Sequence, residues 1–123
     1  MTGKNNISIE RVYNLDAKND GIRLLVDRLW PRGIAKKEID LDDWIMEVAP
    51  SNELRKWFGH DPEKWDDFRK RYRAELSENP DAVRRCLDWL RKDNVTLLYG
   101  ARDKEHNQAV VLRDYLLEKI EKE

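Results

Sequence analysis

The sequence predicts a single α/β domain built on a short, mostly parallel sheet of three to four strands flanked by helices. Two observations lead to this expectation. Residues 95–99 (Val-Thr-Leu-Leu-Tyr) form an apolar segment between two amphipathic helical patterns, which is typical of a helix–strand–helix unit. Residues 22–26 (Ile-Arg-Leu-Leu-Val) form a similar segment, as expected for a strand covered on both faces. No repeat or linker divides the 123 residues, so we expect one domain over 1–123, with a folded core from about 7 to 120.

The first half of the chain predicts two strands and an irregular segment. Residues 7–13 carry β-branched and aromatic side chains that partly alternate, and they are expected to form the first strand. Residues 14–21 are polar and predict a loop before the strand at 22–26. Pro31 ends that strand, and the order Trp30-Pro31-Arg32-Gly33 is typical of a type I turn. Residues 41–49 fit either a strand or one face of a helix, and the following Ala-Pro-Ser favours a strand.

The second half predicts helices around one interior strand. Ser51 is expected to cap a short helix over 53–58 that ends at Gly59. Asp61 and Pro62 begin a longer helix, Pro80 begins another that ends near residue 92, and the last helix is expected from about 105 to 122. The residues expected to face inward from the three long helices are Trp65, Phe68, Tyr72, Leu76, Val83, Cys86, Leu87, Leu90, Ala109, Leu112, Leu116 and Ile120.

The charge composition limits the classes of partner. Charged residues make up 40% of the chain, well above the usual ~25%, yet Lys+Arg is 24 and Asp+Glu is 25, for a net charge of −1. A protein that coats nucleic acid without sequence preference normally has a clear basic excess. Nucleic acid is therefore a less favoured partner than a small ligand.

Cysteine, metal and membrane signals are weak. Cys86 is the one cysteine, so no internal disulfide can form, and no Cys/His cluster has the spacing of a metal site. We expect no metal and no cofactor, because the sequence has neither a phosphate-binding P-loop nor a dinucleotide fingerprint. Residues 1–6 lack the apolar segment of a signal peptide, and no apolar run is long enough to span a membrane, so a cytoplasmic location is expected.

Candidate ligand-binding residues follow two of the expected strands. In open α/β sheets, ligands usually bind beyond the carboxyl ends of the strands. Arg28 and Arg32 follow the strand at 22–26, and Arg102 follows the strand at 95–99. If the strands are parallel neighbours, the three guanidinium groups meet at one edge, near the amino end of the last helix. Guanidinium groups and free backbone N–H groups favour phosphate or carboxylate.

The remaining candidate residues surround this crevice. The turn at 49–51 and the short helix that contains Trp57 and Phe58 are expected to form one wall. The complete set of candidate ligand-binding residues is Arg28, Trp30, Arg32, Ser51, Tyr99, Arg102 and Asn107. The alternative is that the arginines pair with Asp27, Asp103 and other acids on a solvated face. Ser51 is expected to be a helix cap rather than a nucleophile, and His106 is of interest because it lies beside Arg102 and Asp103.

Several segments together carry a family resemblance. They are 26–33 (Val-Asp-Arg-Leu-Trp-Pro-Arg-Gly), Trp44 with 49–51, 54–62 (Leu-Arg-Lys-Trp-Phe-Gly-His-Asp-Pro), Trp65, Phe68, Tyr72 with 75–76, 95–99, and Asn107 with Ala109. Over roughly 7 to 120 the chain resembles the YeaO-like proteins of bacteria and archaea. The resemblance implies a compact α/β fold and no established activity. Residues 99–103 are Tyr-Gly-Ala-Arg-Asp where relatives often carry Tyr-Ala-Ala-Lys-Asp, so Arg102 keeps the positive charge.

Three functions are consistent with the sequence. The first is a protein or enzyme that binds a nucleotide or phosphorylated metabolite through the arginines. The second is a non-catalytic module that binds nucleic acid or protein, because basic and aromatic residues alternate over 28–37 and 54–57. The third is an interaction subunit in which Trp30 or Trp57 lies in an oligomer contact. The first is our main hypothesis.

Overall fold

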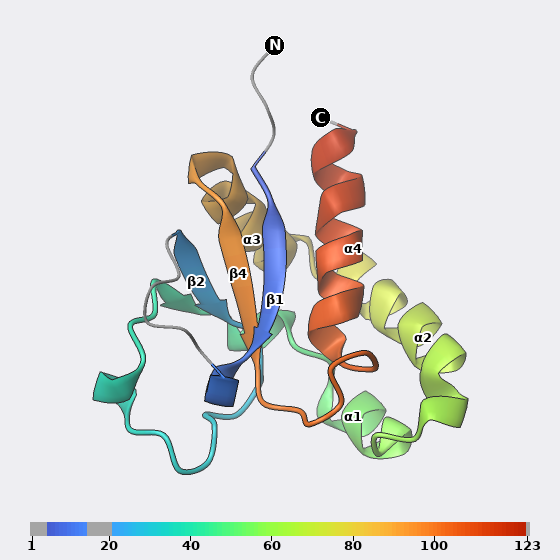
Figure 1. Cartoon of the computed structure of the whole chain (residues 1–123). Helices are drawn as coiled ribbons and strands as arrows, with labels where there is room; N and C mark the ends of the chain where they lie inside the picture. The colour runs from blue at the N-terminus through green and yellow to red at the C-terminus, as the bar shows by residue number, and fades with distance from the viewer. Residues whose placement is uncertain (1–4, 15–20, 123) are drawn as a thin grey trace.

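The computed structural model describes residues 5–14 and 21–122. Its centre is one parallel four-stranded sheet in the order β1-β4-β2-β3 (Figure 1). The strands are β1 (Ile7–Arg11), β2 (Ile22–Leu25), β3 (Asp43–Trp44) and β4 (Val95–Tyr99). The expectation of a parallel α/β sheet of three to four strands is confirmed, and the carboxyl ends of all four strands lie along the same edge.

The interior position of β4 follows from its apolar sequence. All five of its residues are buried, and Val95 is in register with Ile7 of β1 on one side and with Ile22 of β2 on the other. β2 is also buried along its whole length, whereas the outer strand β1 is only partly buried. The two continuously apolar segments of the sequence therefore form the middle of the sheet.

Four helices follow the sequence patterns closely. They are α1 (Asn52–Phe58), α2 (Trp65–Ser77), α3 (Pro80–Lys92) and α4 (Gln108–Glu121). The Ser51 hydroxyl accepts the backbone N–H of Leu54 at the start of α1, and Gly59 ends that helix with φ +54°. Pro80 is the first residue of α3, as expected.

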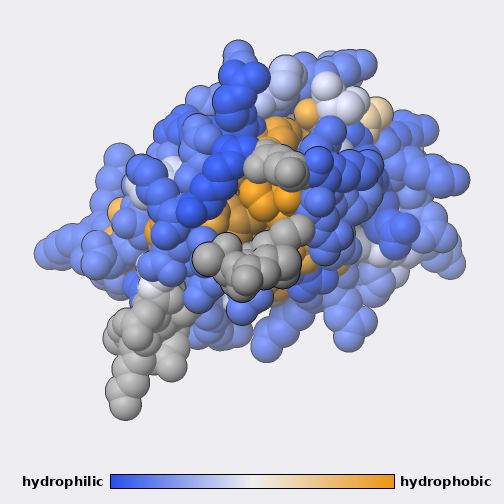
Figure 2. Space-filling model, turned by 90° about the horizontal axis from the view of Figure 1, so that it is seen from above, coloured by the Kyte–Doolittle hydropathy of each residue, from blue (hydrophilic) through white to orange (hydrophobic). Residues whose placement is uncertain are grey.

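The two faces of the sheet are covered differently. Buried residues of all four helices form one large core cluster with alternate residues of β2 and β4, including Ile22, Leu24 and Leu97. Leu25 and Leu98 point to the opposite face, where they pack with Trp44 of β3 and with Trp30 and other residues of the irregular segment between β2 and β3. From above, most of the molecular surface is hydrophilic, with a small apolar area near its centre (Figure 2).

Three local expectations were wrong or only partly right, and a fourth is mostly untested. β1 ends at Arg11 and a 3-10 turn follows at Val12–Asn14. Residues 41–49 form a two-residue strand and then a 3-10 turn at Met46–Val48, so the preference for a strand holds only for Asp43–Trp44. The turn after Pro31 is centred on Arg32 and Gly33, and φ of +80° at Gly33 fits the third residue of a type II turn rather than the fourth of type I. The predicted loop at 14–21 lies mostly outside the described residues.

The last helix begins later than expected. α4 starts at Gln108, because the Asn107 side chain accepts the backbone N–H of Val110 and caps the helix there. Asp103 accepts the backbone N–H groups of Glu105 and His106, which holds these residues in a turn before the helix. Within the described part of the chain, no helix is long and apolar enough to cross a bilayer.

Candidate functional site

A pocket of about 250 Å³ lies at the carboxyl ends of β2 and β4, beside the amino end of α4. This is the place where open parallel sheets commonly bind ligands. Its polar lining consists of Asp27, Arg28, Arg55, His60, His106, Asn107 and Gln108. Its apolar lining includes Leu29, Pro50, Phe58, Phe68 and Ala101.

Asp27 is the carboxylate in the pocket. It lies two residues beyond β2, and its Oδ2 accepts the backbone N–H of Gly100 at 2.8 Å. Its Oδ1 accepts the side-chain amide of Gln108. Burial raises the pKa of Asp27 to about 6, and the hydrogen bonds from Gly100 and Gln108 and the charge of Arg55 offset part of the increase. Asp27 is therefore mainly ionised at neutral pH and mainly protonated near pH 5.

The two arginines in the pocket are held by neutral partners. Arg28 donates from Nε to the carbonyl of Pro50 at 3.2 Å and from Nη2 to the carbonyl of Ala49 at 3.1 Å. Arg55, on α1, donates from Nη2 to the side-chain oxygen of Asn52 at 3.2 Å. Over residues 5–14 and 21–122 we find no ion pair between a carboxylate and either arginine. Both positive charges can therefore act on a molecule in the pocket.

The amino end of α4 forms the opposite side of the pocket. The buried Asn107 caps the helix and also donates from Nδ2 to the carbonyl of Asp103 at 2.9 Å. His106 contacts the Asp103 carboxylate at 2.9 Å through Nδ1, and its ring meets Trp65 edge-on at 5.2 Å. Hydrogen bonds from the backbone of Glu105 and from His106 lower the pKa of Asp103. The positive end of the α4 dipole thus faces the same cavity as Arg28.

Only some of the predicted site residues meet in this pocket. Arg28 and Asn107 line it, and Tyr99 lies buried beside it at the end of β4. Arg102 is exposed and lines a neighbouring cleft, which shares His60, Gly100 and Ala101 with the pocket. The predicted wall is present through Ala49, Pro50 and Phe58.

The other predicted site residues lie elsewhere. Ser51 caps α1 and donates from Oγ to Glu75 at 2.6 Å, in a cleft on the other side of Arg28. Trp30 donates to the carbonyl of Ile34 and packs edge-on against Trp44 under the opposite face of the sheet. Arg32 is exposed, and its carbonyl accepts the hydroxyl of Tyr13. Arg28, Arg32 and Arg102 therefore do not line one common pocket.

The polar residues that line the pocket and were not proposed for binding from the sequence include Asp27, Arg55 and Gln108. Asp27 had a clear signal, because it follows the same buried strand as Arg28. The sequence nevertheless suggested only that it pairs with the arginines. Gln108 was missed because the last helix was expected to begin at about residue 105, which places Gln108 inside the helix rather than at its amino end. Arg55 had no local signal, because an arginine on the surface of a short helix is common.

Two residues that could carry other chemistry are accounted for. Cys86 is buried in the core, and burial raises the pKa of its thiol to about 12, so the thiol is inert as expected. Tyr72 is fully buried and donates its hydroxyl to the carbonyl of Val48 at 2.6 Å. No group of three or more His, Cys, Asp or Glu residues suited to a metal ion occurs in the described part of the chain.

Comparison with known proteins places the chain among uncharacterised relatives. Residues 6–123 match the family described as the inactive DUF488-N3 subclade. The chain is 45% identical to the uncharacterised protein YeaO of Escherichia coli K12 over 111 residues, which are 90% of this chain and 96% of that protein. It is 36% identical over 116 residues to the uncharacterised proteins Mb3100c of Mycobacterium bovis and Rv3073c of Mycobacterium tuberculosis H37Rv, covering 94% of this chain and 98% of each. These matches confirm the resemblance to YeaO-like proteins. No solved structure matches the chain.

Proposed function

We propose that the chain, which belongs to the inactive DUF488-N3 subclade, binds a small anionic ligand in the pocket between Arg28, Arg55 and the amino end of α4. The observation that supports this most directly is that the contacts of Arg28 leave some of its N–H donors unused. A guanidinium group has five N–H donors, and the two recorded contacts of Arg28 use one from Nε and one from Nη2. The remaining donors can bind phosphate or carboxylate.

Three further features support an anion rather than a neutral ligand. Arg55 adds a second positive charge, and the α4 dipole adds a partial one. Asp27 is the one carboxylate among the lining residues, so the balance of charge in the pocket is positive.

The proposal assigns binding and no reaction. The description of the family as an inactive subclade favours binding without catalysis. A nucleic-acid-binding module has less support, because the face of the Trp57 ring on which a base would stack is already covered by other side chains. The ring of Trp57 is covered by Arg71 at 4.2 Å and by Lys64 at 5.2 Å, and both cations are from this chain. We place the protein in the cytoplasm as part of the same proposal, because phosphorylated metabolites are held inside cells.

The test compares arginines inside and outside the pocket. Thermal shift and calorimetry with sugar phosphates and nucleoside monophosphates are expected to show stabilisation of the wild type, by about 2.7 kcal/mol at a ligand concentration 100 times Kd. Arg28→Gln and Arg55→Gln are each expected to weaken binding at least tenfold. Arg32→Gln and Arg102→Gln are matched controls, because they remove the same charge from exposed positions that do not line the pocket.

Two results would overturn the proposal. One is a panel of phosphates in which none stabilises the wild type. The other is an equal loss of affinity in Arg32→Gln and Arg55→Gln, since this would mean that net charge rather than the pocket holds the anion. Unfolding of each variant without ligand shows whether Arg28→Gln has lost binding only because the turn at 49–50 is disturbed.

A further inference from the structure

The Asp27 carboxylate has acceptor capacity that the protein does not use. A carboxylate offers about four acceptor positions. Gly100 N–H occupies one on Oδ2, and the Gln108 amide occupies one on Oδ1. Over the described residues no cation forms an ion pair with Asp27. One acceptor position on each oxygen is therefore left for a molecule in the pocket.

Internal packing does not explain why residue 27 is a carboxylate. An asparagine side chain could accept the Gly100 N–H with its oxygen, and the Gln108 amide could turn so that its oxygen accepts from the asparagine N–H₂ group. The same contacts would then exist without a buried charge. The raised pKa of Asp27 indicates that ionising it in this site costs free energy. A charge that is kept at such a cost inside a cavity is typical of a functional group.

The shape of the pocket favours a small, flat molecule. The rings of Phe58 and Phe68, which both line it, are stacked with centroids 4.3 Å apart. The volume of about 250 Å³ lies just below the ~300–1,000 Å³ typical of small-molecule and cofactor sites, which limits the ligand to a single nucleotide or smaller and excludes a dinucleotide. Leu29, 62% exposed, lies at the edge of the pocket and can cover an apolar ring.

On the basis of the proposed function, we propose that the ligand is a mononucleotide whose base presents two neighbouring N–H donors to the Asp27 carboxylate while its phosphate lies toward Arg28 and Arg55. Guanine has such an edge in its N1–H and N2–H₂ groups. Two parallel N–H···O bonds would use the free acceptor position on each Asp27 oxygen. A neutral base fits better than a guanidinium or ammonium group, because Arg28, Arg55, His60 and His106 line the same pocket.

A graded set of nucleotides tests this inference. Calorimetry at pH 7.5 compares guanosine, inosine and adenosine monophosphates with ribose 5-phosphate. Guanine offers two donors on this edge, hypoxanthine one, and adenine an acceptor beside its amino group. For the wild type we expect affinity to fall in that order, with at least a tenfold difference between the guanine and adenine nucleotides, since a good bidentate pair discriminates by this amount or more.

The variant Asp27→Asn is expected to bind the three nucleotides with similar affinities. Its affinities for the three nucleotides should agree within about threefold, while its affinity for ribose 5-phosphate should not fall, because the arginines are unchanged and a negative charge has been removed from the pocket. If the wild type binds all four phosphates equally, this inference is wrong and the proposed anion site stands. If none of the four binds, both are wrong. A guanine preference that survives in Asp27→Asn would show that another group reads the base.

A measurement on the unmodified protein repeats the test without a mutation. Lowering the pH from 7.5 to 5.0 protonates Asp27, whose pKa is about 6, and should reduce the ratio of guanine to adenine nucleotide affinity at least threefold. The charged and titratable groups that share the pocket are Arg28, Arg55, His60 and His106. A change in the charge of any of these groups acts on the phosphate that both nucleotides share, so the ratio of the two affinities isolates the base contact. A ratio that does not change with pH would overturn the inference.

Discussion

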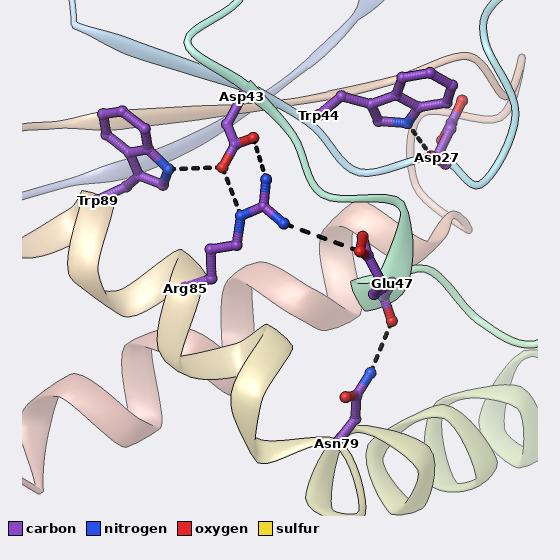
Figure 3. A network of polar contacts seen from close by, with 7 residues as sticks. All are labelled: Asp27, Asp43, Trp44, Glu47, Asn79, Arg85 and Trp89. Carbon is purple, nitrogen blue, oxygen red and sulfur yellow. Dashed lines mark hydrogen bonds and ion pairs between the residues drawn. The ribbon is translucent and has the colours of Figure 1, made fainter.

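Asp27 and Asp43 are two aspartates associated with neighbouring strands, and the partners of their carboxylates differ in kind; Figure 3 shows the partners of Asp43. Asp43, in β3, accepts both Nε and Nη2 of Arg85 from α3, and its Oδ2 also accepts the indole N–H of Trp89 at 3.0 Å. Among the described residues, Asp27, just beyond β2, accepts hydrogen bonds only from the neutral donors of Gly100 and Gln108. Asp43 forms an ion pair with Arg85, whereas Asp27 forms none with the described residues.

The pKa values of the two groups move in opposite directions. Burial alone would raise the pKa of Asp43, but the hydrogen bonds from Arg85 and Trp89 outweigh it, so the pKa lies below its ordinary value. Burial dominates at Asp27 and raises its pKa to about 6. Ionised Asp43 therefore stabilises the fold, whereas ionised Asp27 destabilises it. The comparison separates a structural carboxylate from one that is kept for another purpose.

The Asp43 contacts hold β3 and the following turn against α3. Arg85 also approaches Glu47 at 3.9 Å, and Asn79 donates to the carbonyl of Glu47 at 2.7 Å (Figure 3). β3 has only two residues in the sheet, so the ladder alone contributes little to its position. The same picture shows that the two regions are close in space, because Trp44, next to Asp43, donates its indole N–H to the carbonyl of Asp27 at 2.8 Å.

The largest effect that we expect is from Asp43→Ala. Hydrogen bonds to charged groups contribute about 1.5–3 kcal/mol, and the Arg85 side chain is 45% exposed, so we discount for solvent screening and expect a loss of about 2 kcal/mol at pH 7. Urea unfolding measures it. Asp88→Ala is the matched control, since it removes an aspartate that pairs with Arg91 on the surface of α3 and should cost less than about 0.5 kcal/mol. Equal effects of the two substitutions would contradict a structural role for Asp43.

The opposite sign is expected for Asp27→Asn. The raised pKa means that the folded state binds more protons than the unfolded state between about pH 4 and 6, so the contribution of Asp27 to stability is present below pH 4 and is lost as the pH rises through 6. The amide removes this loss, and we expect a gain of about 1–2 kcal/mol at pH 7 and almost none at pH 4. Urea unfolding at the two pH values checks it. Destabilisation at pH 7 would mean that the charge is needed for folding, and the comparison with Asp43 would fail.

The sequence predicted the fold better than the site, for a physical reason. β4 and α3 were predicted at their observed bounds, because burial on both faces or on one helical face leaves a periodic apolar pattern. Arg28 was predicted correctly at the carboxyl end of β2, since the end of a strand can be read from the sequence. Arg32 is only four residues away, but it is exposed in the turn after Pro31 and does not line the pocket, and the path of an irregular segment leaves no periodic pattern in the sequence.

The remaining parts of the site depend on contacts between distant segments. Gln108 reaches Asp27 across 81 positions in the chain, and Arg55 reaches the pocket from a different helix. Neither contact leaves a local pattern. The start of α4 did have a local signal, because Asn107 is a strong helix cap and should have outweighed the helical appearance of residues 105–106.

The smallest expected effect sharpens the comparison most, because it moves the Asp27 carboxylate and leaves its charge in place. A Cβ atom at Gly100 would lie 3.0 Å from Asp27 Oδ2, closer than ordinary contact, so Gly100→Ala should displace the carboxylate by a few tenths of an ångström. The backbone N–H of residue 100 can still donate, and we expect a loss of stability below about 1 kcal/mol. Ligand affinity should fall about tenfold, because two parallel hydrogen bonds require both oxygens in position. Gly33→Ala is a control outside the pocket, since its added Cβ would meet nothing within 4 Å; its φ of +80° will cost some stability, so only affinity is compared. If Gly100→Ala binds the ligand as tightly as the wild type, the position of Asp27 does not matter for binding, and its unpaired charge needs a different explanation.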